Sequence, residues 1–259
     1  MEPERPTTDP TPTDPMPRGD FDARVTEIAA LGEPVRRALY LWLVAQPEPV
    51  TRDDAAAGAG VARHVAKFHL DKLVDEGLLE VEYSRPPGRG GPGAGRPAKR
   101  YRRAAREVTV SLPERHYELA GRLLARAITD AERDGRAVGD ALGDAARAVG
   151  HSLGRAAGER AGRRPSSSSM RAATDDVLTE CGYEPRHDSD GVVLVNCPFH
   201  ALAQEYTDLV CGMNLDLMHG LVEQLDSAHL EAVLDPAPDR CCVRLRPSAA
   251  DGPADRASA

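Results

Sequence analysis

Five cysteines are the residues of this chain best suited to chemistry. Thiolates bind zinc and iron–sulfur clusters, and they also act as nucleophiles and redox centres. The gaps between the cysteines are too wide for a zinc ribbon built from CxxC pairs, whereas Cys197-Pro198 is a dipeptide that recurs at iron–sulfur sites. A buried cysteine can equally be a small core residue, so metal binding, a thiol switch and packing all stay open. The five are Cys181, Cys197, Cys211, Cys241 and Cys242.

A second group of residues has the chemistry needed to contact nucleic acid. Residues 51–106 contain 12 Lys and Arg against 7 Asp and Glu, although the whole chain has a formal net charge of -8. The rest of the chain is therefore strongly acidic, and the net figure conceals a cationic segment. A run of basic residues at 84–106 is on its own also typical of a solvated arm.

The residues around this cationic segment predict the elements of a winged helix. Helices are expected at residues 34–46, at 52–58 with Thr51 as N-cap, and at 62–76, ending at Gly77. Strands at 78–83 and 99–103 would flank a Pro/Gly-rich loop. In the third helix, apolar periodicity places Val65, Phe68, Leu70, Leu73 and Val74 in the core. The glycine turn between the second and third helices predicts a helix-turn-helix, whose second helix enters the major groove.

The predicted DNA contacts follow from these positions. Early residues of the recognition helix are expected to reach base edges, and the other cations to contact phosphates or the minor groove. The two histidines can equally be packed or solvent-facing. The predicted contacts are Arg63, His64 and Lys67 for base edges, with Thr51, Arg52, His69, Lys72, Arg85, Arg89, Arg96, Lys99 and Arg100 for the remaining contacts.

Two sequence stretches in this segment carry a family resemblance. "HLDKLVDEGLLEVEYSR", followed by "GRPAKRYR", resembles winged-helix repressors of the ArsR/DeoR-like group over residues 33–106. The resemblance implies a transcriptional repressor whose partner is a double-stranded DNA operator. Because such an operator is two-fold related, a homodimer is expected to bind it.

The remaining chain predicts a helical segment and an α/β domain. A short strand at 108–112 and a long helical region to 162 are interpreted as a linker and dimerisation segment, although packing against its own chain is the alternative. Beyond a serine-rich stretch, helices at 170–181 and 204–225, a hairpin of 183–187 with 191–196, and a pair of strands at 231–234 and 242–245 follow. The predicted fold class is mainly α with α+β, divided into a tail (1–20), a winged helix-turn-helix domain (21–106), a linker (107–164), a cysteine-containing sensor domain (165–246) and a second tail (247–259).

The cysteine segments carry a more specific resemblance. "NCPFHALA", "VCGMNLDLMHGL" and "PAPDRCCVRL" resemble the sensor domain of SufR-type iron-sulfur-responsive repressors. That family implies a cluster, typically [4Fe-4S], held by three cysteines and controlling DNA binding. Carried over, the ligands are Cys197, Cys211 and Cys241, with Cys242 in place of or beside Cys241. The fourth ligand is left open between Cys242, Cys181, His200 and a small molecule. Zinc, a thiol switch and an organic effector are the alternatives.

Several function classes are disfavoured. No apolar run approaches the roughly 20 residues of a membrane-spanning helix, and no secretion signal is evident, so a cytoplasmic protein is expected. GxxxxGK[ST] and HExxH arrangements are missing, and "GRGGPGAG" is not placed as a phosphate loop, which should run from a strand directly into a helix. An enzyme would need Cys197 activated by His200 or His219. We therefore expect a non-enzymatic, redox- or cluster-sensing regulator of transcription.

Overall fold

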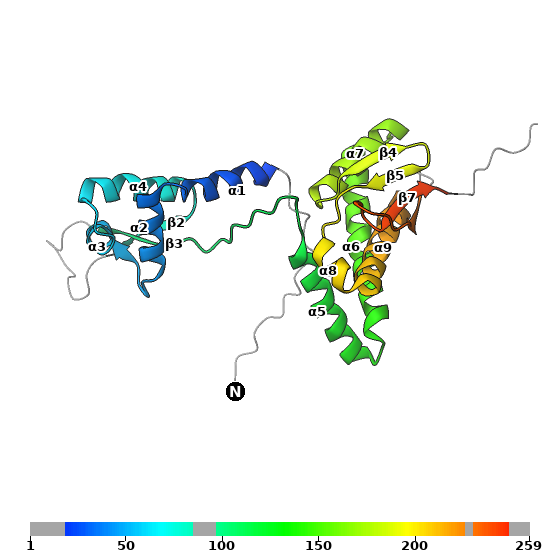
Figure 1. Cartoon of the computed structure of the whole chain (residues 1–259), viewed down its shortest axis with the longest axis horizontal. Coiled ribbons are helices and arrows are strands. Elements are labelled where there is room, and N and C mark those ends of the chain that lie inside the picture. The colour runs from blue at the N-terminus through cyan, green and yellow to red at the C-terminus, as the bar shows by residue number, and fades with distance from the viewer. Residues whose placement is uncertain (1–18, 85–96, 226–229, 249–259) are drawn as a thin grey trace, which may run out of the picture. The chain divides into compact units, whose positions relative to one another are not determined.

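The computed structural model describes residues 19–84, 97–225 and 230–248. The chain forms two compact units, one spanning Arg18–Val110 and the other beginning at Ser111. Both units combine helices with an antiparallel sheet (Figure 1). Within the described residues, no helix is both long and apolar enough to cross a bilayer.

The described residues of the N-terminal unit form four helices and a three-stranded sheet with strand order β1-β3-β2. The predicted helix-turn-helix and both wing strands are confirmed to within two residues at each end. The first helix and the first strand were not predicted. The elements are α1 (Gly19–Ala30), α2 (Pro34–Val44), β1 (Val50–Thr51), α3 (Arg52–Gly58), α4 (Arg63–Asp75), β2 (Leu79–Ser84) and β3 (Ala98–Arg103).

Local capping explains where these helices begin and end. The Glu33 carboxylate accepts hydrogen bonds from two backbone N–H groups of the first turn of α2. Thr51 and Asp54 form a reciprocal capping box at the start of α3, as the predicted N-cap requires. Gly77, at φ 68°, follows α4 in the left-handed conformation that glycine adopts most easily. The boundaries of the helix-turn-helix are therefore encoded locally.

In the part of the C-terminal unit that the structure describes, five helices accompany a four-stranded sheet with strand order β4-β5-β7-β6. The predicted hairpin and the final pair of strands are confirmed, whereas the strand predicted at 108–112 is wrong, since these residues join no ladder. The elements are α5 (Tyr117–Asp134), α6 (Val138–Ala161), α7 (Ser167–Glu180), β4 (Pro185–Asp188), β5 (Gly191–Leu194), α8 (His200–Glu205), α9 (Thr207–Gln224), β6 (Leu230–Leu234) and β7 (Val243–Pro247).

One apolar core unites all five helices with the sheet. The buried faces of α5 and α6 belong to this core, with α6 packed against α9 and α7 (Figure 1). Of the two interpretations of this helical segment, packing against its own chain therefore describes its buried faces. Homodimer formation stays a prediction.

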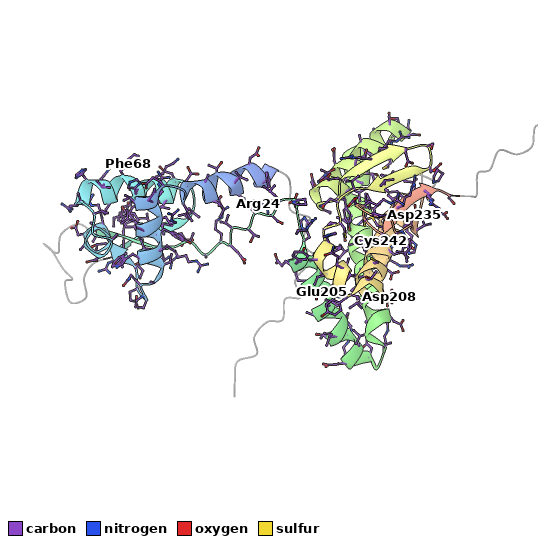
Figure 2. The ribbon with its side chains drawn as sticks, viewed as in Figure 1. Arg24, Phe68, Glu205, Asp208, Asp235 and Cys242 are labelled. Carbon is purple, nitrogen blue, oxygen red and sulfur yellow. The ribbon has the colours of Figure 1, made fainter. Side chains whose placement is uncertain are left out.

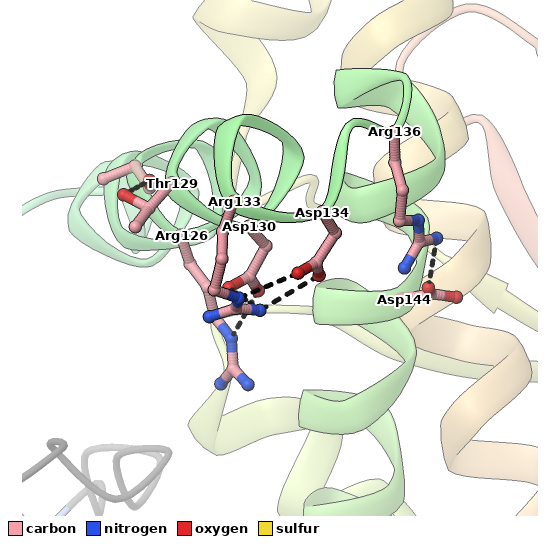
Figure 3. Close-up of polar contacts among 8 residues, drawn as sticks. Arg126, Thr129, Asp130, Arg133, Asp134, Arg136 and Asp144 are labelled. Atoms are coloured by element: carbon pink, nitrogen blue, oxygen red, sulfur yellow. Dashed lines mark hydrogen bonds and ion pairs between the residues drawn. The ribbon is translucent and has the colours of Figure 1, made fainter.

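A turn between α5 and α6 divides the predicted helical region into two helices. Gly135 ends α5 at φ 66°. Arg133 bridges Asp130 and Asp134, each at 2.9 Å, and Arg136 reaches Asp144 in the first turns of α6 at 2.5 Å (Figure 3). These ion pairs lie at the surface, and each contributes little to stability.

Candidate nucleic-acid interface and cysteine cluster

The solvent-facing side of α4 is the candidate surface for contacting DNA. His64, Lys67, Phe68 and Lys72 are exposed and recur at the spacing of one helix face, while Ala66, Leu70 and Leu73 form the buried side. The predicted inward position of Phe68 is wrong, because 65% of this residue is exposed. Figure 2 labels its side chain on α4. Phe68, which the sequence did not predict as a DNA contact, therefore lies between His64 and Lys72 on the candidate surface.

Carboxylates pair most of the cations predicted to contact DNA. Arg63 binds Asp53 through two hydrogen bonds of 2.5 and 3.1 Å. Asp71 holds Lys67 at 3.3 Å and Lys99 at 2.8 Å, and the Lys99 hydrogen bond is the main reason that the pKa of Asp71 is lowered. Two further pairs are Arg52 with Asp53, at 3.9 Å, and Lys72 with Glu76.

Two other predicted DNA contacts have different surroundings. His69 is buried against α2, where Arg36 donates to its Nδ1 at 3.4 Å and the Glu33 carboxylate lies at 3.4 Å. Its ring is thus part of the α2–α4 packing and does not lie on the exposed face. Arg100 donates to the Pro49 carbonyl at 2.9 Å, which ties β3 to the segment before α3. Arg85, Arg89 and Arg96 lie outside the described residues.

Three separate segments bring the four C-terminal cysteines together. Cys197 follows β5, Cys211 lies in the second turn of α9, and Cys241 and Cys242 immediately precede β7. The Cys241 N–H donates to the Leu194 carbonyl at 2.8 Å, which fixes this pair beside the end of β5. Cys242 is partly exposed, whereas the other three are buried (Figure 2 labels Cys242). All five cysteines of the chain are free thiols.

The four thiols act on one another electrostatically. The neighbouring Cys241 thiol, together with burial, raises the pKa of Cys197 far above its usual range. The Cys197 thiol lowers the pKa of Cys241, but Cys242 and burial outweigh it and raise that pKa to about 12. Burial also raises the pKa of Cys211. In the absence of a bound cation, these three groups are therefore neutral thiols.

A buried amide orients one of these thiols. Asn214, one turn after Cys211 on α9, is 1% exposed and donates from Nδ2 to the Cys241 Sγ at 3.1 Å. Its Oδ1 accepts a hydrogen bond from the hydroxyl of Tyr183 at 2.5 Å. Because both polar ends of the amide are paired, its orientation is fixed. The i, i+3 spacing from Cys211 was the available sequence signal for Asn214.

The Cys197 loop is also tied to the first residues of the C-terminal unit. Arg115 donates to the Cys197 carbonyl at 3.0 Å and to the side-chain oxygen of Asn196. The Asn196 amide in turn donates to the Glu114 carbonyl at 3.0 Å, and the His116 N–H donates to the Pro198 carbonyl at 3.1 Å. These bonds join segments about 80 positions apart, so no local sequence signal could reveal them.

The described cysteines do not surround a position for a single metal ion. Within the described ranges, no group of three or more His, Cys, Asp and Glu side chains surrounds one point where a metal ion could bind. Zinc needs such a point, because its ligands all bind one ion at 2.0–2.3 Å. In a [4Fe-4S] cluster, separate thiolates bind separate irons, so such a cluster does not require one common point.

The remaining candidates for ligand or base have other surroundings. Burial is the main reason that the pKa of Cys181 is raised to about 12. The charges that act on this thiol belong to Glu180, Glu114 and Arg160, not to the other cysteines. His200 is exposed at the start of α8, and its backbone N–H donates to the Cys197 carbonyl at 3.1 Å. His219 bonds to the Ala232 carbonyl at 3.1 Å. A buried thiol with a raised pKa is the opposite of an activated nucleophile.

A separate cavity of about 440 Å³ lies in the C-terminal unit between α7 and the sheet. Met170, Leu178 and Val192 supply apolar lining, and Arg171 and the His187–Asp175 pair supply polar lining. Its volume falls in the range of small-molecule pockets.

Comparison with known proteins supports the N-terminal interpretation. A family model described as a helix-turn-helix domain matches residues 31–82, which span α2 to β2. No curated protein and no solved structure matches the chain. The matched domain indicates a DNA-binding regulator of transcription, with a mixed α/β unit as its C-terminal part.

Proposed function

We propose that the chain is a dimeric transcriptional repressor whose operator binding responds to an iron–sulfur cluster, or to redox state, through its C-terminal cysteines. This is the SufR-type function that the sequence motifs imply. The observation that carries the proposal is the gathering of four free cysteines, Cys197, Cys211, Cys241 and Cys242, from three separate segments of the C-terminal unit. Thiolates are the side chains that ligate iron–sulfur clusters and undergo redox chemistry.

The ligands of the proposed cluster are Cys197, Cys211 and Cys241, with Cys242 as the fourth. When bound, an iron–sulfur cluster supplies a redox-active group that is sensitive to oxidants. Asn214 orients the Cys241 thiol, and β5 and β7 fix the backbone around Cys197 and Cys241. Each ligand must lose its proton on binding, since thiolates are the ligating form.

The bonds of Arg115 supply a route from the cysteines toward the DNA-binding unit. A change in the position of the Cys197 carbonyl is transmitted to Arg115 and Glu114, which follow the boundary between the units at Ser111. The bonds of Arg115 couple the cysteines to the DNA-binding unit only if the segment that connects the two units has two arrangements. Each state of the cysteines must then favour one of these arrangements.

Anaerobic purification tests the proposal. The protein is expected to show visible absorption and to contain both iron and sulfide, and its affinity for a selected operator duplex is expected to change when the cluster is removed. Cys197→Ser should abolish the absorption, whereas the matched variant Cys181→Ser should retain it. A colourless protein without sulfide would exclude the cluster, and stoichiometric zinc in its place would identify the zinc alternative.

The cavity beside α7 favours a second candidate, namely a repressor controlled by an organic effector. In that case the response of DNA binding would survive Cys197→Ser and would be lost when Leu178→Trp fills the cavity. The two candidates therefore give opposite results with the same pair of variants.

A further inference from the structure

Phe68 combines strong exposure with a held orientation. It is the most exposed aromatic residue among the described parts of the chain, at 65%, whereas Phe199 is buried to 1%. A phenylalanine left in water forgoes a large burial energy, which contact with an apolar group of a partner would recover. Core packing cannot recover it, because the buried side of α4 is already filled by Ala66, Leu70 and Leu73.

The ring of Phe68 does not project freely. It meets the His69 ring edge-to-face, with centroids 5.1 Å apart and planes inclined by 73°. His69 is itself held against α2 by Arg36 and Glu33. The exposed aromatic ring is thus supported by a buried, hydrogen-bonded ring, which reduces the entropy lost when the ring binds a partner.

The neighbours of Phe68 identify the partner as DNA. His64 lies one turn before it and Lys67 directly beside it, and both are exposed polar groups of the kind that contact base edges and phosphates. The major groove offers one apolar feature, the 5-methyl group of thymine, and phenylalanine is among the side chains that contact it. We propose that Phe68 reads thymine in the operator through this methyl group. The inference rests on the proposed DNA-binding function and adds a base preference to it.

Replacing thymine by deoxyuridine tests the contact, since it removes only the methyl group. Duplexes that bind the full chain are first selected from a random library, and each thymine is then replaced singly. In each half-site, one thymine is expected to contact Phe68. Replacing that single thymine should weaken binding about fourfold, which is the effect expected from burying one methyl group. Phe68→Ala is expected to bind thymine and deoxyuridine duplexes equally, whereas Phe68→Leu should keep part of the preference.

Leu41→Ala is the matched control, because Leu41 is a similarly exposed apolar residue of the same unit, on α2. It should keep the fourfold preference, and both alanine variants should keep the unfolding temperature of the parent. Equal binding of all duplexes by the parent chain would overturn this inference but leave DNA binding intact. A preference that persists in Phe68→Ala would also overturn it. Failure to bind any duplex would overturn the proposed function as well.

Discussion

Gly150 of α6 and Gly220 of α9 lie where the backbones of two helices touch. A Cβ added at Gly150 would stand 1.9 Å from the Leu217 carbonyl oxygen, and one added at Gly220 would stand 2.1 Å from the Arg147 carbonyl oxygen. Since α9 carries Cys211 and Asn214, this close approach sets the position of two residues of the cysteine cluster.

Gly150→Ala is therefore expected to force α6 and α9 apart. Overlap with rigid backbone should lower the free energy of unfolding by about 3 kcal/mol, measured by denaturant titration. Gly158→Ala is the control on the same helix, because nothing lies within 4 Å of its added methyl group. The control should be neutral or stabilising by up to about 1 kcal/mol. Equal effects of the two substitutions would contradict the close approach.

Asn214→Leu should destabilise the protein because it leaves the buried Tyr183 hydroxyl without an acceptor. The expected loss in unfolding free energy is about 2 kcal/mol. Adding Tyr183→Phe removes the stranded hydroxyl, so the double variant should recover most of that loss. Additive losses in chemical denaturation would show that the two side chains do not depend on one another.

Arg115→Ala should separate sensing from DNA binding. Without the guanidinium that holds the Cys197 carbonyl, the ratio of operator affinities with and without the cluster should fall toward one. Iron and sulfide content should stay at the parental level. Arg122→Ala, which removes an exposed arginine paired with Glu118 on α5, should keep the parental ratio. A full response in Arg115→Ala would exclude this route.

Asp71→Asn should strengthen DNA binding by freeing Lys67 and Lys99 for phosphates. Affinity at low salt should rise several-fold. The plot of log affinity against log salt concentration should become steeper, by the slope that up to about two additional phosphate contacts contribute. Asp75→Asn removes the same charge from the same helix and should have a smaller effect, since Asp75 has no ion pair among the described residues. Identical salt slopes for both variants would refute the pairing argument.

The pKa of Asp71 fixes the pH range of this experiment. Because the Lys99 hydrogen bond lowers that pKa below its ordinary value of 3.8, the carboxylate contributes its stabilisation at higher pH and loses it only as the pH falls through the lowered pKa. The pairs with Lys67 and Lys99 are therefore intact in any assay near neutral pH, and Asp71→Asn should act there at full strength.

The sequence predicts the N-terminal unit well because its signals are local. Helix periodicity, the Thr51 cap and Gly77 act within a few residues, and the structure confirms their boundaries. Periodicity fails at Phe68, since an apolar residue at core spacing can equally be exposed for binding. It also gives no sign of α1, whose Val25 and Ile28 are exposed.

The cysteine site is predictable only in part. Motif resemblance identifies its four cysteines, but their mutual contacts depend on tertiary packing between β5, α9 and β7. Asn214 shares a helix with Cys211 and carries a weak local signal, whereas Arg115 reaches Cys197 only through the fold. Partners distant in sequence are set by packing, which a single sequence does not display.

Cys241 and Cys242 lie near the C-terminal end of the described chain, so they are synthesised long after the DNA-binding unit. β3 completes the DNA-binding unit at Arg103, but β7, which aligns the last two cysteines, begins only at Val243. At ~5–20 residues per second, a ribosome needs roughly 7 to 28 seconds to cover the distance between them. A nascent chain can therefore fold its DNA-binding unit before its last two cysteines exist, and any cofactor that needs all four cysteines would be loaded after that unit has folded.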